Sequence, residues 1–449
     1  MSYLFYNIKR HNYIRFSSVF PDAHEYTPKE MYKKIYISFK IMIAYLLNRI
    51  RGKIKSPCIC KISEILILEG TINQKKSLLP VYNNLDTSTY TLVGPGGYEK
   101  YLPWLKINSY SCIYILTFLF NYWLSTKEEK RIIRSYFDDF FYTIGTVVMA
   151  EKLVRNNRLR LVIMANDHYY LYRAFKEAAD RCHIPTLYLQ HASVTYRFPP
   201  LQFAYSFLDG MDSFAKYYSI GNMSGEVFLC GSPRFDIISK YSKKQRSHFT
   251  IGIALNMLDD ESEAKRLCMF LQKSGYADVI VRPHPRMKMD DGWYFAHNIR
   301  VSDSKSELSF EFLSKISLMI SGESAIHLDA ALMNVKSICY AFNCNESIKD
   351  WYSFQEQGLY PYVDNFDSLL HEIESIKANG SGSESDALYY NASHGLPVNG
   401  HIGALLTDFI VSYLSGDINQ FKKKYDFVEV MPHVWCYSNY GGYFYSHIA

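Results

Sequence analysis

The stretch SLMISGESAIHLDAALMNVKSICYAF, residues 317–342, holds two short apolar runs separated by a helical pattern. Residues 317–321 and 336–342 have the length and apolar content of buried strands, and residues 324–334 have those of a helix. A strand, a helix and a strand in this order predict a βαβ unit, in which the strands run parallel and helices cover the sheet. The stretch therefore predicts an α/β fold.

The same alternation extends toward the N-terminus. It predicts strands at 249–255, 278–281 and 299–302, and helices at 261–275 and 306–316, with Gly275 ending the first helix and Ser306 capping the second. The first half of the chain repeats the pattern less clearly, with predicted strands at 64–68, 159–165, 185–190, 217–221 and 227–231. The polar, basic residues 239–248 form a natural linker between the two halves.

These patterns predict two doubly wound parallel-sheet domains of Rossmann type. The first covers residues 1–240 and includes helical insertions, among them an N-terminal elaboration, and the second covers residues 249–376. Residues 377–386, KANGSGSESD, have the composition of a flexible loop. The segment 377–449 is therefore expected to be this loop followed by a helical tail.

Composition and charge exclude several classes of protein. The chain has 449 residues, 48% hydrophobic and 21% charged, with a net charge of +5. This charge is too small to indicate nucleic-acid binding, and no RNA-binding motif is present. Cys58 and Cys60 have no second pair to complete a zinc site, so we expect reduced thiols, no metal and a cytoplasmic protein. Charged residues interrupt the apolar ones in residues 1–16, which predicts no signal peptide.

Two segments raise the question of membrane contact. Residues 33–55 are apolar in the middle and basic at both ends, which is typical either of an amphipathic helix on an anionic membrane or of a buried helix. Residues 107–126 carry no charge, but four polar residues dilute them, and this favours an internal helix over a membrane span. A peripheral contact with the inner membrane is therefore one of the expectations.

Polar residues follow the predicted strands of the second half. In open parallel sheets, ligands bind outside the carboxyl ends of the strands. His284 follows one strand between two prolines that stiffen the backbone, and a second strand end leads directly into a helix, whose N-terminus attracts phosphate. The residues predicted to bind a phosphate-bearing ligand are Asn256, Arg282, His284, Pro285, Ser321, Gly322, Glu323, Ser324 and Asp329. Three of these residues also have a purely structural interpretation: Ser324 as a helix cap, Asp329 as a solvated helix residue, and His284 as a turn residue.

A second set of polar residues follows the predicted strands of the first half. Asn166, Asp167 and His168 come after one strand, and Gln190 and His191 after another. Asp and His side chains can act as general bases, and Asp167 is the first candidate here and His191 the second. A role for Asp167 as a helix cap is the alternative. Glu69 and Gly70, after the strand at 64–68, are further candidates for substrate contact, and residues 230–236, CGSPRFD, are expected to shape the cleft between the domains.

The motif VRPHP, residues 281–285, followed by residues 317–340, resembles the nucleotide-binding domain of GT-B glycosyltransferases of bacterial surface-polysaccharide synthesis. In CMP-sugar sialyl- and Kdo-transferases, an HP motif and a later serine motif hold the nucleotide phosphate. CDP-glycerol phosphotransferases of the teichoic-acid type and the related 2-epimerase fold carry similar elements. The resemblance covers roughly residues 160–370, over the strand–helix alternation. Sialyltransferases carry an acidic motif before HP, whereas DDG at 290–292 follows it here, so that motif does not transfer.

The resemblance implies a metal-independent GT-B enzyme with two domains facing a cleft and no cofactor beyond its nucleotide-sugar co-substrate. The candidate residues of the second half would bind the donor, and His284 would donate to the leaving phosphate. The candidates of the first half would face the acceptor, with Asp167 or His191 as the base for its hydroxyl. The expected donor is a nucleotide sugar, with a CMP-linked acidic sugar favoured, and the expected acceptor is a glycan or lipid-linked saccharide of an O-antigen or capsule. One alternative is a polyol-phosphate transferase that uses a CDP-linked donor. Another is a subunit of an assembly complex that binds nucleotide sugars without turnover.

Overall fold

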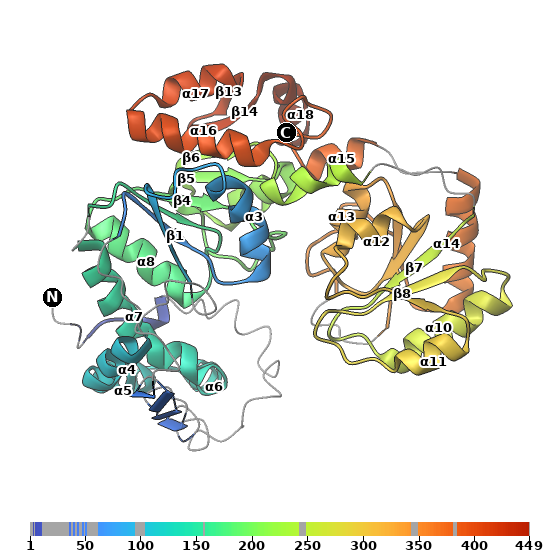
Figure 1. Ribbon diagram of the computed structural model, residues 1–449, viewed down its shortest axis with the longest axis horizontal. Helices are drawn as coiled ribbons and strands as arrows, with labels where there is room; N and C mark the ends of the chain where they lie inside the picture. The colour runs from blue at the N-terminus through green and yellow to red at the C-terminus, as the bar shows by residue number, and fades with distance from the viewer. Residues whose placement is uncertain are drawn as a thin grey trace.

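Short buried strands build two separate sheets, each with its own helices (Figure 1). The computed structural model describes residues 3, 5–10, 62–94, 104–155, 158–241, 248–342, 349–379 and 384–448, with single positions between 36 and 51. Among these residues, eight strands form the first sheet in the order β13-β14-β6-β5-β4-β3-β1-β2, and six form the second in the order β12-β11-β10-β7-β8-β9. The predicted α/β class with two doubly wound parallel sheets is confirmed.

The first sheet belongs to the N-terminal domain. Its strands are β1 (Ile65–Leu68), β2 (Tyr90–Val93), β3 (Leu161–Met164), β4 (Thr186–Leu189), β5 (Gln202–Leu208) and β6 (Ser224–Leu229), all parallel. Its helical elements are η1 (Ile8–Arg10), α3 (Ile72–Tyr82), α4 (Trp104–Ile113), α5 (Ile115–Trp123), α6 (Lys127–Ser135), α7 (Phe137–Arg155), α8 (Tyr170–Arg181), α9 (Met211–Ile220) and η2 (Pro233–Lys240). Strands β1, β3 and β4 are buried at every position, as expected for a parallel sheet covered on both faces.

The second sheet belongs to the C-terminal domain. Its strands are β7 (Ile251–Ala254), β8 (Val279–Arg282), β9 (Arg300–Val301), β10 (Leu318–Ser321), β11 (Lys336–Tyr340) and β12 (Tyr362–Val363). Its helices are α10 (Glu261–Lys273), α11 (Asp291–Ala296), α12 (Ser309–Ser314), α13 (Ile326–Leu332) and α14 (Phe366–Asn379).

Alternate residues of the second sheet enter two different cores. Ile251 and Ile253 pack with α10 and α14, whereas Ala254 packs with α12 and α13 on the opposite face. The position between the two isoleucines must be small, because a Cβ at Gly252 would lie 2.5 Å from the side chain of Ile316. The period of two that defines a strand therefore also sorts the helices between the two faces.

The C-terminal segment is not the loop and helical tail that the sequence predicts. After α15 (Glu384–Tyr390), it forms α16 (Ile402–Ser415), α17 (Ile418–Lys424), β13 (Phe427–Met431), β14 (Val434–Tyr437) and α18 (Ser438–Ile448). Strand β14 pairs in parallel with β6, so the chain returns from the second domain to extend the first sheet (Figure 1). The central part of the predicted flexible loop, residues 380–383, lies outside the described residues.

Two local predictions are wrong. The sequence predicts a strand over residues 217–221, but Tyr217 lies in helix α9, where Met211, Phe214 and Tyr217 bury one face against the sheet. This tertiary packing outweighs the strand preference of two tyrosines and an isoleucine. Helix α12 begins at Ser309 rather than near Ser306, whose hydroxyl instead donates to Asp303.

Residues 107–126 form two short helices, α4 and α5, and not one internal helix. Within the described residues, no helix is long and apolar enough to cross a bilayer. Helix α5 buries Phe118 against α6 and α7 but leaves Leu116, Leu119 and Trp123 exposed. Most of the segment 33–55 lies outside the described residues. Its described positions include exposed apolar side chains at Tyr36, Phe39, Ile43, Leu47 and Ile50.

Candidate active site

The strand order places a topological switch point in each sheet. In the first sheet the order reverses between β1 and β3, and in the second it reverses between β7 and β10. Crevices at the carboxyl side of such points are where ligands bind in doubly wound sheets. Asn166–His168 follow β3 and Glu69 follows β1, while Asn256 follows β7 and Gly322–Ser324 follow β10. Most of the predicted site residues therefore flank the two switch points.

At the first switch point, Asp167 and His168 form a hydrogen-bonded pair. Nδ1 of His168 lies 2.9 Å from Oδ1 of Asp167, and the hydroxyl of Tyr217 donates to Oδ2 of Asp167 at 2.7 Å. The Tyr217 hydroxyl also lies 3.2 Å from that of Tyr188 on β4. The side chain of Asp167 is only 1% exposed, whereas that of His168 is 16% exposed. The helix-cap alternative for Asp167 does not hold, because Asn166 Oδ1 accepts the amides of His168 and Tyr169 instead.

The predicted second base, His191, lies beside this pair. The rings of His168 and His191 are stacked with centroids 6.5 Å apart, and Phe198 contacts His168 with ring centroids 4.5 Å apart. Burial, and then the neighbouring His168, lower the pKa of His191 to about 3, so its imidazole is neutral at neutral pH. Nδ1 of His191 is buried without a hydrogen-bond partner, which is uncommon for a buried polar atom.

Of three other acceptor-side candidates, Gly70 and Gln190 support the local backbone, whereas Oε1 of Glu69 is buried without a partner. Glu69 is fully buried, and its Oε2 accepts a hydrogen bond from Tyr82 at 3.0 Å. The amide of Gly70 donates to Gln74 Oε1 at 2.7 Å, within the capping box that begins α3. Gln190 bridges two loops, because its Oε1 accepts from the amide of Asp209 and its Nε2 donates to the carbonyl of Ala192. None of these contacts requires a ligand.

At the second switch point, the loop after β10 is closely packed. The hydroxyl of Ser321 donates to the carbonyl of Ala254 at 2.7 Å and is fully buried. A Cβ at Gly322 would lie 2.3 Å from Oδ1 of Asp259, so this position requires glycine. Burial raises the pKa of Asp259 to about 6. Ser321 and Gly322 therefore hold the loop against β7 and do not form the predicted phosphate cradle.

Glu323 and its neighbours keep some capacity for a ligand. Oε1 of Glu323 accepts from the hydroxyl of Tyr360 at 2.9 Å and from the amide of Asp350 at 3.0 Å, but Oε2 is buried without a partner. Burial raises the pKa of Glu323. The side chain of Asn256 donates to the carbonyl of Glu323 at 2.9 Å, and Ser324 Oγ accepts the amide of Ile326 at 3.4 Å. Helix α13 begins only at Ile326 and has seven residues.

His284 is oriented by its own turn. The amide of Arg286 donates to Nδ1 of His284 at 3.2 Å, which leaves the ring proton on Nε2. Burial, followed by the charge of Arg286, lowers the pKa of His284, so the neutral ring presents Nε2–H as a donor. Strand β8 is separated from β10 by β7, so His284 lies about 10 Å across the sheet from the Ser324 loop rather than on its neighbouring strand. Pro285, next to it, is exposed.

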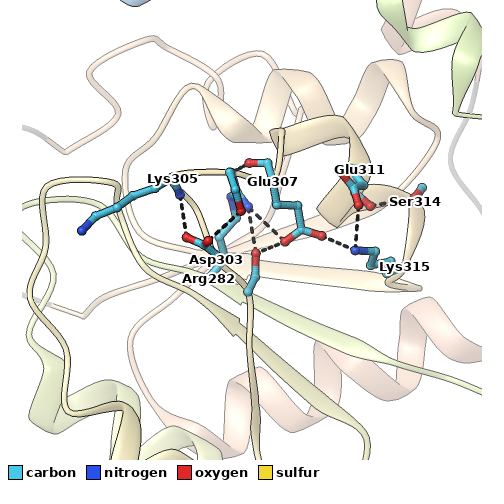
Figure 2. Close-up of polar contacts among 9 residues, drawn as sticks. Arg282, Asp303, Lys305, Glu307, Glu311, Ser314 and Lys315 are labelled. Atoms are coloured by element: carbon cyan, nitrogen blue, oxygen red, sulfur yellow. Dashed lines mark hydrogen bonds and ion pairs between the residues drawn. The ribbon is translucent and has the colours of Figure 1, made fainter.

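Arg282 is not available as the predicted donor-binding residue. Figure 2 shows its guanidinium bonded to Glu307, whose carboxylate also pairs with Lys315, and Lys315 pairs in turn with Glu311. Nη1 donates to Ser302 Oγ and Nη2 to the carbonyl of Glu307, each at 2.8 Å, and Arg282 is 7% exposed. The residue therefore ties β8 to the segment after β9.

The segment after β6 packs against the second domain, where the rings of Phe235 and Phe310 lie 6.3 Å apart. Arg234, after β6, donates to Asp209 Oδ2 at 2.9 Å at the end of β5. Burial raises the pKa of Asp329 on α13, and Arg234 is the first of the charges that oppose this rise. Asp329 Oδ2 accepts from Ser309 Oγ at 2.9 Å, so it is held by α12 as well. Asp236 of the CGSPRFD segment accepts the amides of Ile402 and Gly403, and so caps α16 rather than lining the cleft.

Sequence reasoning misses some of the site residues. Tyr217 falls in a predicted strand, and Tyr188 and Asp209 carry no motif, whereas Arg234 lies in the CGSPRFD segment that the sequence assigns to the cleft. The signal that could have found Asp209 is its position after the strand β5, which is absent from the predicted strands.

Among the described residues, no group of three or more His, Cys, Asp or Glu side chains is placed to hold a metal ion.

Comparisons with known proteins give similarity to solved structures alone. No family model matches the chain, and no curated protein does. Among the solved structures, UDP-GlcNAc 2-epimerase from Methanocaldococcus jannaschii is similar to this chain, with a TM-score of 0.48 and 12% identity. The alignment covers 78% of this chain and 99% of the epimerase chain. For a variant of the wall teichoic acid polymerase TagF soaked with CDPG, the alignment covers 84% of this chain and 98% of the TagF chain, with a TM-score of 0.46 and 12% identity. For MurG from Acinetobacter baumannii, the alignment covers 77% of this chain and 99% of the MurG chain, with a TM-score of 0.45 and 12% identity.

The sequence resembles transferases of the teichoic-acid type and the 2-epimerase fold, and both kinds of protein are among these matches. At this identity and these TM-scores, the matches transfer no residue role, substrate or reaction to the present chain.

Proposed function

We propose that this protein is a glycosyltransferase that works in the cleft between its two domains. The donor, a nucleotide sugar, would bind at the carboxyl edge of the six-stranded sheet, and the saccharide acceptor at the carboxyl edge of the eight-stranded sheet. The observation that carries this proposal is that polar side chains gather at the carboxyl ends of the strands at both switch points.

The residues on the donor side suit a nucleotide sugar. Nε2–H of His284 is a neutral donor for the leaving phosphate, and Ser324 can add its hydroxyl proton. The unpaired Oε2 of Glu323 is a buried acceptor that a sugar hydroxyl would satisfy. The favoured donor is a CMP-linked acidic sugar, and the favoured acceptor is a bacterial O-antigen or capsule saccharide. A CDP-linked polyol-phosphate donor is the alternative, since the same groups would hold its phosphates.

The first test is nucleotide binding. A ligand that binds only the folded protein raises its apparent stability by about 2.7 kcal/mol at a concentration of 100 Kd. We expect one of CMP, CDP, UDP and GDP to raise the melting temperature clearly more than the others, and the corresponding nucleotide sugar to donate its sugar to a saccharide acceptor. Absence of a shift with all four nucleotides would contradict the proposal, and a shift without transfer would favour the non-catalytic binding subunit.

We further propose that the N-terminal domain contacts the cytoplasmic face of an anionic membrane through α5. Leu116, Leu119 and Trp123 are 61%, 50% and 72% exposed, and they line a surface groove of about 350 Å³ with Phe5 and Phe120. Exposed apolar patches of this kind mark contact sites. The next helix, α6, adds Lys127, Lys130, Arg131 and Arg134, and cations beside an apolar face suit an anionic leaflet. A lipid-linked acceptor would be reached from such a position.

Replacement of Leu116, Leu119 and Trp123 by serine should weaken co-sedimentation with anionic vesicles by ~10-fold or more, because the apolar area that enters the bilayer is lost. High salt should weaken binding of the unchanged protein as well. A matched control is Phe295→Ser, which removes an apolar side chain that is 63% exposed on the C-terminal domain. Equal sedimentation of the triple variant and the control would refute the assignment of this face.

A further inference from the structure

A continuous chain of hydrogen bonds leads from the core to His168. It runs from the Tyr188 hydroxyl to the Tyr217 hydroxyl at 3.2 Å, from Tyr217 to Asp167 Oδ2 at 2.7 Å, and from Asp167 Oδ1 to His168 Nδ1 at 2.9 Å. The members come from β4, from α9 and from the loop after β3, so three elements determine its geometry. Tyr188 and Tyr217 are almost fully buried, and His168 is the end that reaches solvent.

Asp167 cannot itself meet an acceptor hydroxyl in this arrangement. Its side chain is 1% exposed, and each of its carboxylate oxygens already has a protein partner. An acceptor hydroxyl would have to displace either His168 or the buried Tyr217. A carboxylate in this position orients the imidazole and stabilises its protonated form, as a buried aspartate does in a hydrolase triad.

The pairing with Asp167 also determines which nitrogen of His168 can accept a proton. Because a carboxylate only accepts hydrogen bonds, the proton of the neutral ring sits on Nδ1 and the lone pair on Nε2. The Asn166 side-chain amide lies 3.5 Å from Nε2, and the ring of Phe198 packs against the imidazole, so the ring orientation is fixed on the other side too. The contact with Asn166 is at the limit of a hydrogen bond, and the acceptor hydroxyl would replace it at Nε2.

His191 is less suited to the same task. Its pKa of about 3 lies far below neutral pH, and efficient general bases have a pKa near the working pH. Being neutral, His191 also does not repel a proton that arrives at His168. The two stacked histidines therefore have different properties, and only His168 has a carboxylate on the far side of its ring.

We infer that His168 takes the proton of the acceptor hydroxyl, and that Asp167 and Tyr217 are positioning residues. This inference rests on the proposed function. In the step, the hydroxyl oxygen forms a bond to the anomeric carbon of the donor sugar, and the bond from that carbon to the phosphate oxygen breaks. The electron pair of that bond leaves with the nucleotide, and the hydroxyl proton moves to Nε2 of His168. The resulting imidazolium is held by the Asp167 carboxylate.

The test compares four variants in an assay of sugar transfer, with donor affinity measured separately by calorimetry. His168→Ala should lower kcat by ~10² to 10⁴-fold while the affinity for the nucleotide is unchanged, and added imidazole should restore part of the rate. Asp167→Asn should lower kcat while the nucleotide affinity is unchanged, because the imidazolium loses the carboxylate that orients and holds it. Tyr217→Phe should lower kcat only a few-fold, since Tyr217 bonds to Asp167 and not to His168 itself. His191→Gln should lower kcat far less than His168→Ala does, because His191 has no carboxylate to hold its protonated form.

Imidazole rescue separates a chemical role of His168 from a structural one. Near-normal kcat in a folded His168→Ala, or a loss of kcat in that variant that imidazole does not restore, would overturn the inference. An unchanged protein that transfers no sugar from any nucleotide sugar it binds would overturn the proposed function itself.

Discussion

His284→Ala should lower the rate of sugar transfer by ~10²-fold or more, the loss that follows removal of one preorganised donor to a developing negative charge. Nδ1 of His284 accepts the amide of Arg286, so Nε2–H points away from the turn as a fixed donor. Burial and the Arg286 charge lower the pKa of His284, and the ring therefore donates without carrying a charge of its own. A donor that acts mainly in the transition state should change kcat more than nucleotide affinity.

The control for this prediction is His248→Ala. His248 is exposed and precedes β7, so it lies at the amino edge of the same sheet, opposite to the edge that His284 follows. Its removal should leave kcat and nucleotide affinity unchanged. Equal kcat values for the His284 and His248 variants would remove His284 from the proposed reaction.

Lys216→Met should lower the free energy of unfolding by about 3–5 kcal/mol, the range for removal of one member of a buried ion pair. Lys216 of α9 is fully buried, pairs with Asp212 at 2.5 Å and donates to the carbonyl of Tyr352 at 2.6 Å. The contact with Tyr352 joins the N-terminal domain to a segment of the C-terminal domain. The substitution leaves the Asp212 carboxylate buried without its cation and breaks a link between the domains.

Denaturation by urea would measure this loss. The matched control is Lys176→Met, which breaks a pair of the same i,i+4 spacing in α8, where the partner Asp180 has a side chain that is 51% exposed. That change should cost at most about 1 kcal/mol, as for other surface pairs. The double substitution Lys216→Met with Asp212→Leu should recover part of the stability, because no buried charge is then left unpaired. A single Lys216 variant as stable as the Lys176 control would show that the buried pair contributes little.

The strand ends are the part of the site that the sequence predicts well. A strand that stops at Pro283, or at a polar run such as Asn166–His168, marks its own carboxyl end, and the rule for parallel sheets then assigns those residues to one edge. The roles of these residues are less predictable than their positions. The sequence favours Asp167 as the base, yet the environment of Asp167 is set by Tyr217, which lies 50 residues further along the chain. Nothing in the residues around Asp167 indicates that both of its oxygens have protein partners.

Arg282 illustrates the same limit on the donor side. Its position at the end of β8 is evident from the sequence, but its partners Ser302 and Glu307 lie 20 and 25 residues away. A cation at a strand end can bind a phosphate or a neighbouring carboxylate equally well on sequence alone. The structure decides between them because the segment after β9 folds back over the guanidinium (Figure 2).

By itself, the sequence determined the α/β class, the parallel strands of the second sheet and the position of most candidate residues at strand ends. These features follow from side-chain periodicity and from prolines and glycines that end helices and strands, and both signals act within a few residues. Only the tertiary structure decided the strand order with its two switch points, the return of β14 to β6 from a distant part of the chain and the hydrogen-bond chain that ends at His168. The physical reason is that these contacts join segments distant in sequence, and their free energy depends on burial and pairing that no local pattern encodes.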